Sequence, residues 1–143
     1  PLMEGSPNEA IKNNVIGTLK TARTASRYHV KKFILISTDK AVNPINLYGG
    51  TKLVSDKLFI AANAYAGAKD VCFSIVRYGN VAGSRGSVIP FFRNIVNEGG
   101  TSLPITDYRM TRFWISLDEG VQLVIKALSE AKGGNFYLQD SVF

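Results

Sequence analysis

Two short and largely apolar segments, residues 33–37 and 71–78, constrain the fold of this 143-residue chain most strongly. Neither shows a strict alternation of apolar and polar residues, and such runs are typical of strands covered on both faces of a parallel sheet. Apolar residues recur at helical spacing ahead of each run, over 8–28 and 47–66. Because helix and strand alternate, the sequence predicts an α/β fold whose parallel strands are joined by right-handed crossovers.

Local signals refine the bounds of these elements. The first helix is expected to begin after Pro7 with Asn8 as its cap. The expected core positions of the second helix are Leu53, Leu58, Ile60 and Ala61. Beyond residue 79 the expected elements are a helix over 90–97, an irregular stretch over 103–111, a strand over 113–115, a helix capped by Asp118 and a strand over 136–138. Phe113 and Trp114 are expected to pack in the core.

The bulk composition excludes several classes of protein. An apolar fraction of 45% supports one domain with a real core. The net charge of +6 comes from Lys and Arg spread along the chain without a basic–aromatic motif, so no nucleic-acid partner is expected. It suits an anionic small substrate such as a nucleotide with a diphosphate. The lone Cys72, expected as a buried filler, excludes an internal disulfide and a cysteine-rich metal site. No apolar run approaches the roughly 20 residues that span a bilayer, and no signal peptide is found, so no membrane partner is expected.

Acid–base groups cluster directly after the first apolar run. Thr38, Asp39 and Lys40 follow it, and Tyr48 and Lys52 begin the next helical segment four residues apart, on one face. A phenol has a pKa of about 10 and must lose about three units to act as a base near neutrality. A nearby ammonium and a cationic nicotinamide ring can together supply that change. A Tyr and a Lys at this spacing are by themselves also compatible with ordinary packing. Their position directly after the strand indicates an enzyme that transfers a hydride and a proton.

The chain resembles the extended short-chain dehydrogenase/reductase superfamily. Within it, the chain is similar to the inverting UDP-N-acetylglucosamine 4,6-dehydratases that begin pseudaminic acid synthesis. The segments that carry the resemblance are 1–4, 14–18, 37–44, 46–52, 77–81, 83–88, 103–107 and 110–115. The family's glycine-rich dinucleotide fingerprint has no counterpart here. The resemblance therefore implies a partial doubly wound, Rossmann-like sheet, with roughly the first third of the enzyme and a C-terminal tail missing.

The resemblance also implies a division of the chain and a set of catalytic roles. Residues 1–82 would be the catalytic half of the dinucleotide-binding domain, 83–112 part of a substrate-binding region, and 113–143 a truncated return to the sheet. Thr38, Tyr48 and Lys52 would form the hydroxyl–Tyr–Lys triad that oxidises C4 of the sugar. Lys40 would take the proton from C5 and Asp39 would protonate the leaving C6 hydroxyl. Since neighbours in an extended segment point to opposite faces, a turn must redirect one of them.

Binding residues follow from the same resemblance. The cofactor would be NADP, held by Asn14, Tyr48, Lys52 and Tyr78. The UDP-sugar would be held by Asn80, Arg85, Ser87 and Arg112. Tyr48 favours the soluble inverting branch, because related retaining dehydratases commonly carry Met there. The full-length enzyme is expected to be a cytoplasmic homo-oligomer.

Several alternatives stay open on the sequence alone. A sugar-nucleotide 4-epimerase of the same superfamily would need no water-eliminating pair, so Asp39-Lys40 argues against it. The chain can also be an inactive fragment that serves only as a binding module. Single positions also have ordinary structural interpretations. Asp39-Lys40 can form a simple turn, Asn14 can be a surface residue of a helix, and the arginines can be solvated surface charges.

Overall fold

The computed structural model describes residues 3–66, 71–84 and 86–139. Its centre is a sheet of three parallel strands in the order β1-β2-β5. These strands are β1 (Lys32–Thr38), β2 (Cys72–Tyr78) and β5 (Phe136–Leu138). The register pairs Thr38 with Tyr78, so β1 and β2 end side by side. A ladder of two residues per strand, β3 (Asn80–Val81) with β4 (Trp114–Ile115), lies beyond that edge.

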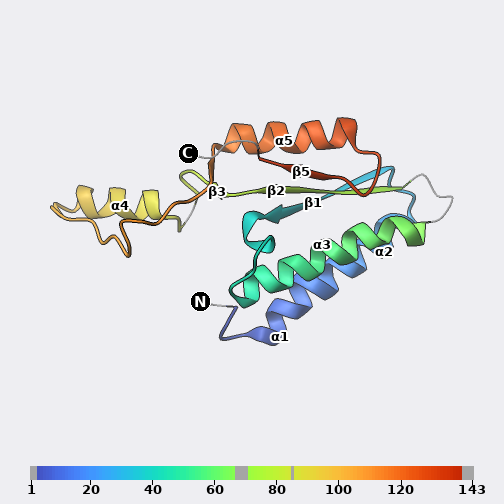
Figure 1. Ribbon diagram of the computed structural model, residues 1–143, viewed down its shortest axis with the longest axis horizontal. Helices are drawn as coiled ribbons and strands as arrows, with labels where there is room; N and C mark the ends of the chain where they lie inside the picture. The colour runs from blue at the N-terminus through green and yellow to red at the C-terminus, as the bar shows by residue number, and fades with distance from the viewer. Residues whose placement is uncertain (1–2, 67–70, 85, 140–143) are drawn as a thin grey trace.

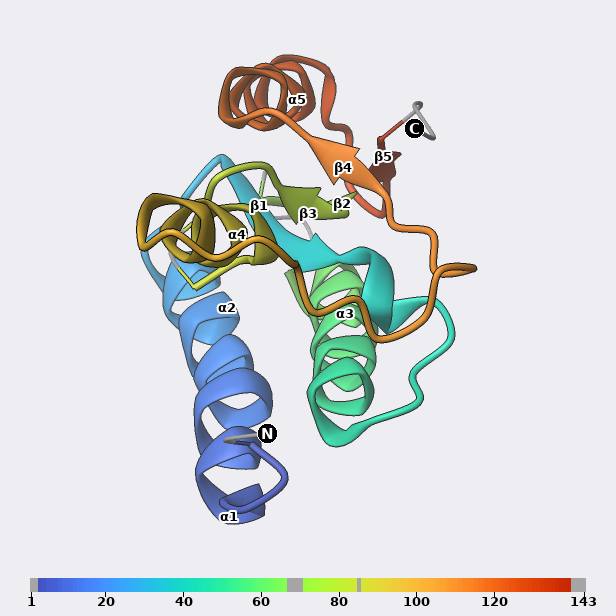
Figure 2. The same cartoon turned by 90° about the vertical axis from the view of Figure 1, so that its left-hand side faces the viewer.

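Helices cover both faces of the sheet (Figures 1 and 2). One face carries α2 and α3 and the other carries α5, whereas α4 extends away from the sheet. The α-helices are α1 (Pro7–Ala10), α2 (Gly17–Arg27), α3 (Leu47–Ala66), α4 (Val88–Asn97) and α5 (Leu117–Glu130). A π-helical segment, η1 (Ile11–Ile16), joins α1 to α2, and a 3₁₀ turn, η2 (Asp39–Ala41), follows β1. The predicted α/β fold with a parallel sheet is confirmed.

An aromatic cluster holds α3 to the sheet. The ring centroids of Phe59 and Phe73 lie 5.2 Å apart and those of Phe33 and Phe59 5.3 Å apart, both in edge-to-face geometry. Phe59 and Phe73 are fully buried. The Asn63 side chain then bonds both backbone groups of Phe73, donating to its O and accepting from its N at 2.9 Å. The position of α3 on β2 is therefore fixed by packing and by directed hydrogen bonds.

Some local predictions were wrong. The first helix has Ser6, not Asn8, at its N-cap position, without a side-chain cap hydrogen bond. Pro7 is its first residue, since proline loses no useful N–H there. The last helix is capped by Ser116, not Asp118, because the Ser116 hydroxyl accepts from the Glu119 N–H in a capping box.

The predicted burial also needs correction. Ala61 is exposed, and the α3 face that meets the sheet is marked by Phe59 instead. Cys72 is only half-buried. Ile36 is 48% exposed because one face of β1 is incompletely covered. Phe113 is 45% exposed and outside the core, since β4 pairs only with the short β3.

Candidate active site

The carboxyl ends of β1 and β2 bring the predicted acid–base groups together. Thr38 is the last residue of β1 and caps the η2 turn, its hydroxyl accepting from the Lys40 N–H at 3.4 Å. The turn redirects the chain immediately after the strand, as the sequence required. Ligands of open α/β sheets sit outside this edge.

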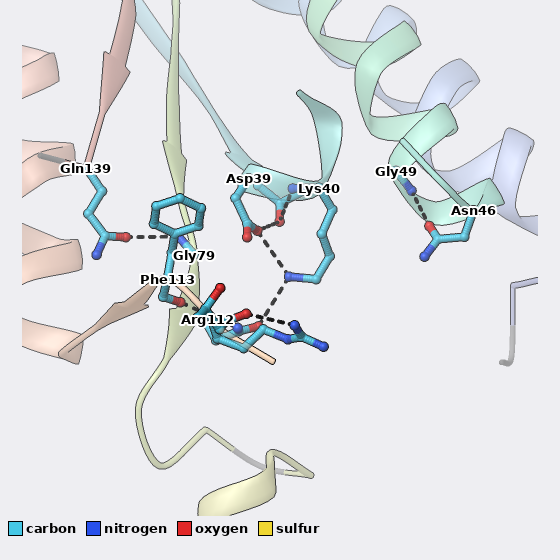
Figure 3. Close-up of polar contacts among 11 residues, drawn as sticks. Asp39, Lys40, Asn46, Gly49, Gly79, Arg112, Phe113 and Gln139 are labelled. Atoms are coloured by element: carbon cyan, nitrogen blue, oxygen red, sulfur yellow. Dashed lines mark hydrogen bonds and ion pairs between the residues drawn. The ribbon is translucent and has the colours of Figure 1, made fainter. Parts of the chain in front are cut away.

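Asp39 and Lys40 lie next to each other at this edge (Figure 3), and hydrogen bonds of Lys40 join Asp39 to Asn80. Lys40 Nζ donates to Asp39 Oδ1 at 3.0 Å and to Asn80 Oδ1 at 3.2 Å. Asp39 Oδ1 also accepts from the Thr38 hydroxyl at 2.9 Å. Asn80 in turn donates to Phe113 O at 3.4 Å. The Lys40 ammonium is therefore held between β1 and the segment that follows β2.

The start of α3 is fixed next to these residues. Asn46 Oδ1 accepts from the Gly49 N–H at 2.9 Å, and Glu4 Oε1 accepts from the Leu47 N–H at 2.6 Å. At Gly49 a Cβ atom would lie 2.5 Å from Lys40 O, so only glycine lets the η2 turn approach the helix this closely. Tyr48 lies within this first turn and takes its position from these contacts.

The protonation of Tyr48 and Lys52 is set mainly by burial. Burial raises the pKa of Tyr48, with a smaller rise from the Asp39 carboxylate, and outweighs the lowering by the Thr38 hydrogen bond. Burial lowers the pKa of Lys52, against a rise from Asp56. Lys52 Nζ donates to Ile36 O at 2.9 Å. The lowering of the phenol pKa that the sequence argument requires depends on a nicotinamide ring as well as on Lys52, so it stays a prediction.

A pocket of about 440 Å³ joins the two halves of the predicted site. It is lined by catalytic candidates and by substrate candidates, among them Thr38, Lys40, Tyr48, Asn80, Ser87 and Arg112. A larger hollow of about 560 Å³ lies between α2 and α3 and is lined by none of them. The acid–base chemistry therefore favours the smaller pocket as the site.

The remaining predicted residues occupy different places. Asn14 donates to the Thr51 hydroxyl at 3.0 Å and so contacts the neighbour of Lys52, not Lys52 itself. Tyr78 lines an apolar groove against α5, and burial raises its pKa. Ser87 Oγ is buried without a hydrogen-bond partner in the described part of the chain. Arg85 lies outside the described residues.

Two features of the site were not predicted. Asp56 and Arg77 form a buried ion pair between α3 and β2. The position of Asp56, one helical turn after Lys52, was a readable signal. Gln139 accepts from the Gly79 N–H at 3.0 Å and donates to Trp114 O, which joins β2 to β4. No local pattern marks that contact, which spans a long stretch of sequence. Among the described residues no cluster of His, Cys, Asp or Glu could hold a metal ion, and no helix is long and apolar enough to cross a membrane.

Residues 1–142 match the family of polysaccharide biosynthesis proteins. The chain belongs to this family. It is 53% identical to the inverting UDP-N-acetylglucosamine 4,6-dehydratase of Campylobacter jejuni over 96% of its length, and 43% identical to a UDP-glucose 4-epimerase of Rickettsia rickettsii over 99%. In both alignments it spans 41% of the relative's length.

Solved structures show the same fold. The X-ray structure of Pen from Bacillus thuringiensis matches with a TM-score of 0.90 and 39% identity, covering 96% of this chain and 42% of that one. The dTDP-glucose 4,6-dehydratase DesIV of Streptomyces venezuelae, with NAD and TYD bound, matches with a TM-score of 0.76 and 25% identity, covering 89% of this chain and 44% of that one. The chain is thus a partial Rossmann-like unit of this family.

Proposed function

We propose that this chain carries the catalytic residues of an inverting UDP-N-acetylglucosamine 4,6-dehydratase. The observation that carries the proposal is the contact of Lys40 Nζ with both Asp39 and Asn80, in a pocket also lined by Thr38 and Tyr48. Two members of the proposed triad, Thr38 and Tyr48, and one member of the proposed pair, Lys40, line this pocket, and Asp39 is joined to it through its contact with Lys40. The similarity to the Campylobacter dehydratase supports the same assignment.

In the first step Tyr48 accepts the proton of the sugar 4-hydroxyl and Thr38 hydrogen-bonds the same oxygen. A nicotinamide cofactor, when bound, supplies the hydride acceptor for C4. Lys52 fits a role in holding its ribose, because an ammonium has three N–H donors and the described structure uses one of them on Ile36 O. Asn14 and Tyr78 complete the proposed cofactor side. By family resemblance we propose NADP.

The elimination uses the Asp39–Lys40 pair. Moving one proton from Lys40 Nζ to Asp39 Oδ1 along their 3.0 Å contact yields a neutral amine and a neutral acid. Lys40 then removes the C5 proton while Asp39 protonates the C6 hydroxyl, which leaves as water. The step regenerates the ammonium and the carboxylate, so the pair needs no outside proton. Hydride returned to C6 by the bound cofactor and a proton from solvent added to C5 on the opposite face would complete the inverted 4-keto-6-deoxy sugar, while the proton that Tyr48 took from the 4-hydroxyl would return to solvent.

We propose that the pocket's second half binds the UDP-sugar. Arg112 is exposed and suits a charge-assisted contact with phosphate, and Asn80 and the unpartnered Ser87 hydroxyl supply further polar groups. Arg85 joins this set by resemblance only. Residues 83–112 are thereby the proposed substrate-binding region, and pseudaminic acid synthesis in a cytoplasmic homo-oligomer is the proposed context.

Incubation of the full-length protein with UDP-N-acetylglucosamine, followed by NMR of the products, tests the proposal. A 4-keto-6-deoxy product is expected. The Lys40→Ala variant should still oxidise C4 and bind the cofactor but lose dehydration, whereas Lys57→Ala, on the exposed face of α3, should keep both steps. Full dehydration by Lys40→Ala would remove Lys40 from the mechanism.

A UDP-sugar 4-epimerase is the second candidate, and the similarity to the Rickettsia epimerase favours it. An epimerase would release only the C4 epimer in the same NMR assay. A third possibility is that the 143-residue chain is only a binding module. We expect this chain alone to be inactive, and titration of it with NADP separates cofactor binding from turnover.

A further inference from the structure

A buried ion pair ties the catalytic helix to the central sheet. Arg77 of β2 donates through Nε at 2.8 Å and Nη2 at 2.7 Å to one oxygen, Asp56 Oδ2. The Asp56 side chain is 0% exposed and that of Arg77 is 14% exposed. A charge pair buried to this degree is costly to desolvate and stabilises little by itself. Its presence one helical turn after Lys52 therefore calls for another explanation.

The pair connects three elements. The Arg77 guanidinium carbon lies 4.6 Å from the centroid of the Phe136 ring on β5, while its nitrogens hold Asp56 on α3. Arg77 is also the residue before Tyr78, at the carboxyl end of β2. The ion pair therefore fixes how α3 is rotated about its own axis relative to the strand ends, where Thr38 and Asn80 lie.

Unsatisfied groups at the same interface indicate that the pair is held for its position. Asp56 Oδ1 and Ser37 Oγ are both buried without a hydrogen-bond partner in the described structure. Ser37 is opposite Arg77 in the β1–β2 register, so both side chains point to the face that α3 covers. Leaving buried polar atoms unpaired is unfavourable, and a purely structural contact would gain from apolar residues instead.

We infer that Asp56 and Arg77 are positioning residues, whose ion pair fixes the face of α3 that presents Tyr48 and Lys52 and keeps a negative charge one turn from the Lys52 ammonium. The inference rests on the proposed function for its kinetic consequence. The expected effect on the titration of Lys52 does not depend on the proposed function, because that titration is a property of the folded protein. Asp56 raises the pKa of Lys52 against the lowering by burial, in agreement with this arrangement.

Other ionisable groups must be considered in any pH test. Those on the elements around Lys52 are Tyr48 on α3, Asp39 and Lys40 on η2, and Arg77 and Tyr78 on β2. Lys12 of η1 is paired with Glu9 at the surface. None of these groups contributes to the shift of the Lys52 pKa, whose causes are burial and the Asp56 carboxylate. The Asp56→Asn change therefore removes one defined negative charge while preserving side-chain size.

The first experiment measures the titration of Lys52 in the full-length protein by NMR of labelled lysine side chains, assigned with Lys52→Arg. Asp56→Asn should move the Lys52 titration to lower pH by about half a unit or more, because a stabilising charge is lost. The matched control is Glu9→Gln, which breaks an exposed ion pair and should leave it unchanged. An unchanged titration in folded Asp56→Asn overturns the inference. This measurement needs no catalytic activity, so it stands even where the proposed dehydration fails.

The second experiment follows reduction of the nicotinamide, the step that a dehydratase and an epimerase share. Asp56→Asn should lower kcat about tenfold or more with little change in KM, and the alkaline limb of its pH profile should move to lower pH. Where Asp56→Asn does not fold, Asp56→Glu decides, because it keeps the charge but displaces the carboxylate. Asp56→Glu should then titrate Lys52 as wild type does while kcat falls, and a wild-type kcat would overturn the positioning role.

Discussion

The two sides of the pocket differ in how firmly they are held. On the side of Lys40 and Tyr48, the fully buried Phe59 and Phe73 rings and the Asn63 hydrogen bonds fix α3 on the sheet. On the other side, α4 has no buried residue and extends away from the sheet (Figure 1). Tyr108, in the segment that follows, is 91% exposed.

This difference matches the chemistry proposed for each side. Proton transfer requires donor and acceptor within hydrogen-bond reach, so acid–base groups benefit from rigid elements. Phosphate contacts tolerate more freedom, and a weakly packed segment can adjust to a ligand. We therefore expect changes on the packed side to affect rate and stability, and changes on the other side to affect substrate binding.

The largest effect is expected for Tyr48→Phe, on the packed side. Loss of the phenol should lower the rate of nicotinamide reduction in the full-length protein by about 10²–10⁴-fold, the range of general acid–base catalysis. Folding should be unaffected because only a hydroxyl is removed. Tyr65→Phe is the control, since Tyr65 lies on the same helix but is 87% exposed. Equal losses in the two variants would contradict the assignment of Tyr48.

A matched pair of phenylalanine truncations tests the contrast in packing. Phe59→Ala should reduce the free energy of unfolding of the 143-residue chain by about 3–5 kcal/mol, because it leaves a cavity between α3 and the sheet. Phe91→Ala in α4 should change it by less than about 0.5 kcal/mol, since Phe91 is 52% exposed. Urea unfolding measures both. Similar losses in the two variants would show that α4 is packed as firmly as α3.

The packed side was also the easier one to predict. The bounds of α3 were predicted as Leu47–Ala66, which the structure confirms, because its apolar spacing is local information. Its buried face was predicted less well, with Ala61 named and Phe59 missed, since several faces of an apolar helix satisfy the same spacing. The cap at Ser116 was readable from its spacing to Glu119 but the nearby Asp118 was a competing choice.

Contacts between distant residues set the limit of prediction for the site. The turn after Thr38 followed from local chemistry and is confirmed. The contact of Lys40 with Asn80 depends on strand register, and the pairing of Asp56 with Arg77 depends on how α3 packs on β2, neither of which a local pattern fixes. The raised pKa of Tyr48 was unforeseen for the same reason, because burial is a property of the assembled fold.

On the less packed side, Arg112→Gln should act on binding. We expect KM for the UDP-sugar to rise about tenfold with kcat nearly unchanged, because a phosphate contact is lost in ground state and transition state alike. Arg109→Gln is the control, since Arg109 is an exposed arginine already paired with Asp107. A fall in kcat without a change in KM for Arg112→Gln would place this arginine at the reacting atoms instead.

The smallest effect is expected at Ser116, where the chain leaves β4 and re-enters the packed layer as α5. Its hydroxyl and N–H hydrogen-bond Glu119 and lower the pKa of that carboxyl below its ordinary value of 4.5. A lowered folded-state pKa gives stability that is present above the unfolded value and is lost as pH falls through the folded one. Ser116→Ala should therefore lower the free energy of unfolding by about 1 kcal/mol near neutral pH. The loss should be smaller in acid, where Glu119 is protonated. Thermal unfolding at neutral and acid pH measures this. A loss that is the same at both pH values would mean that the Ser116 cap acts without the Glu119 carboxylate.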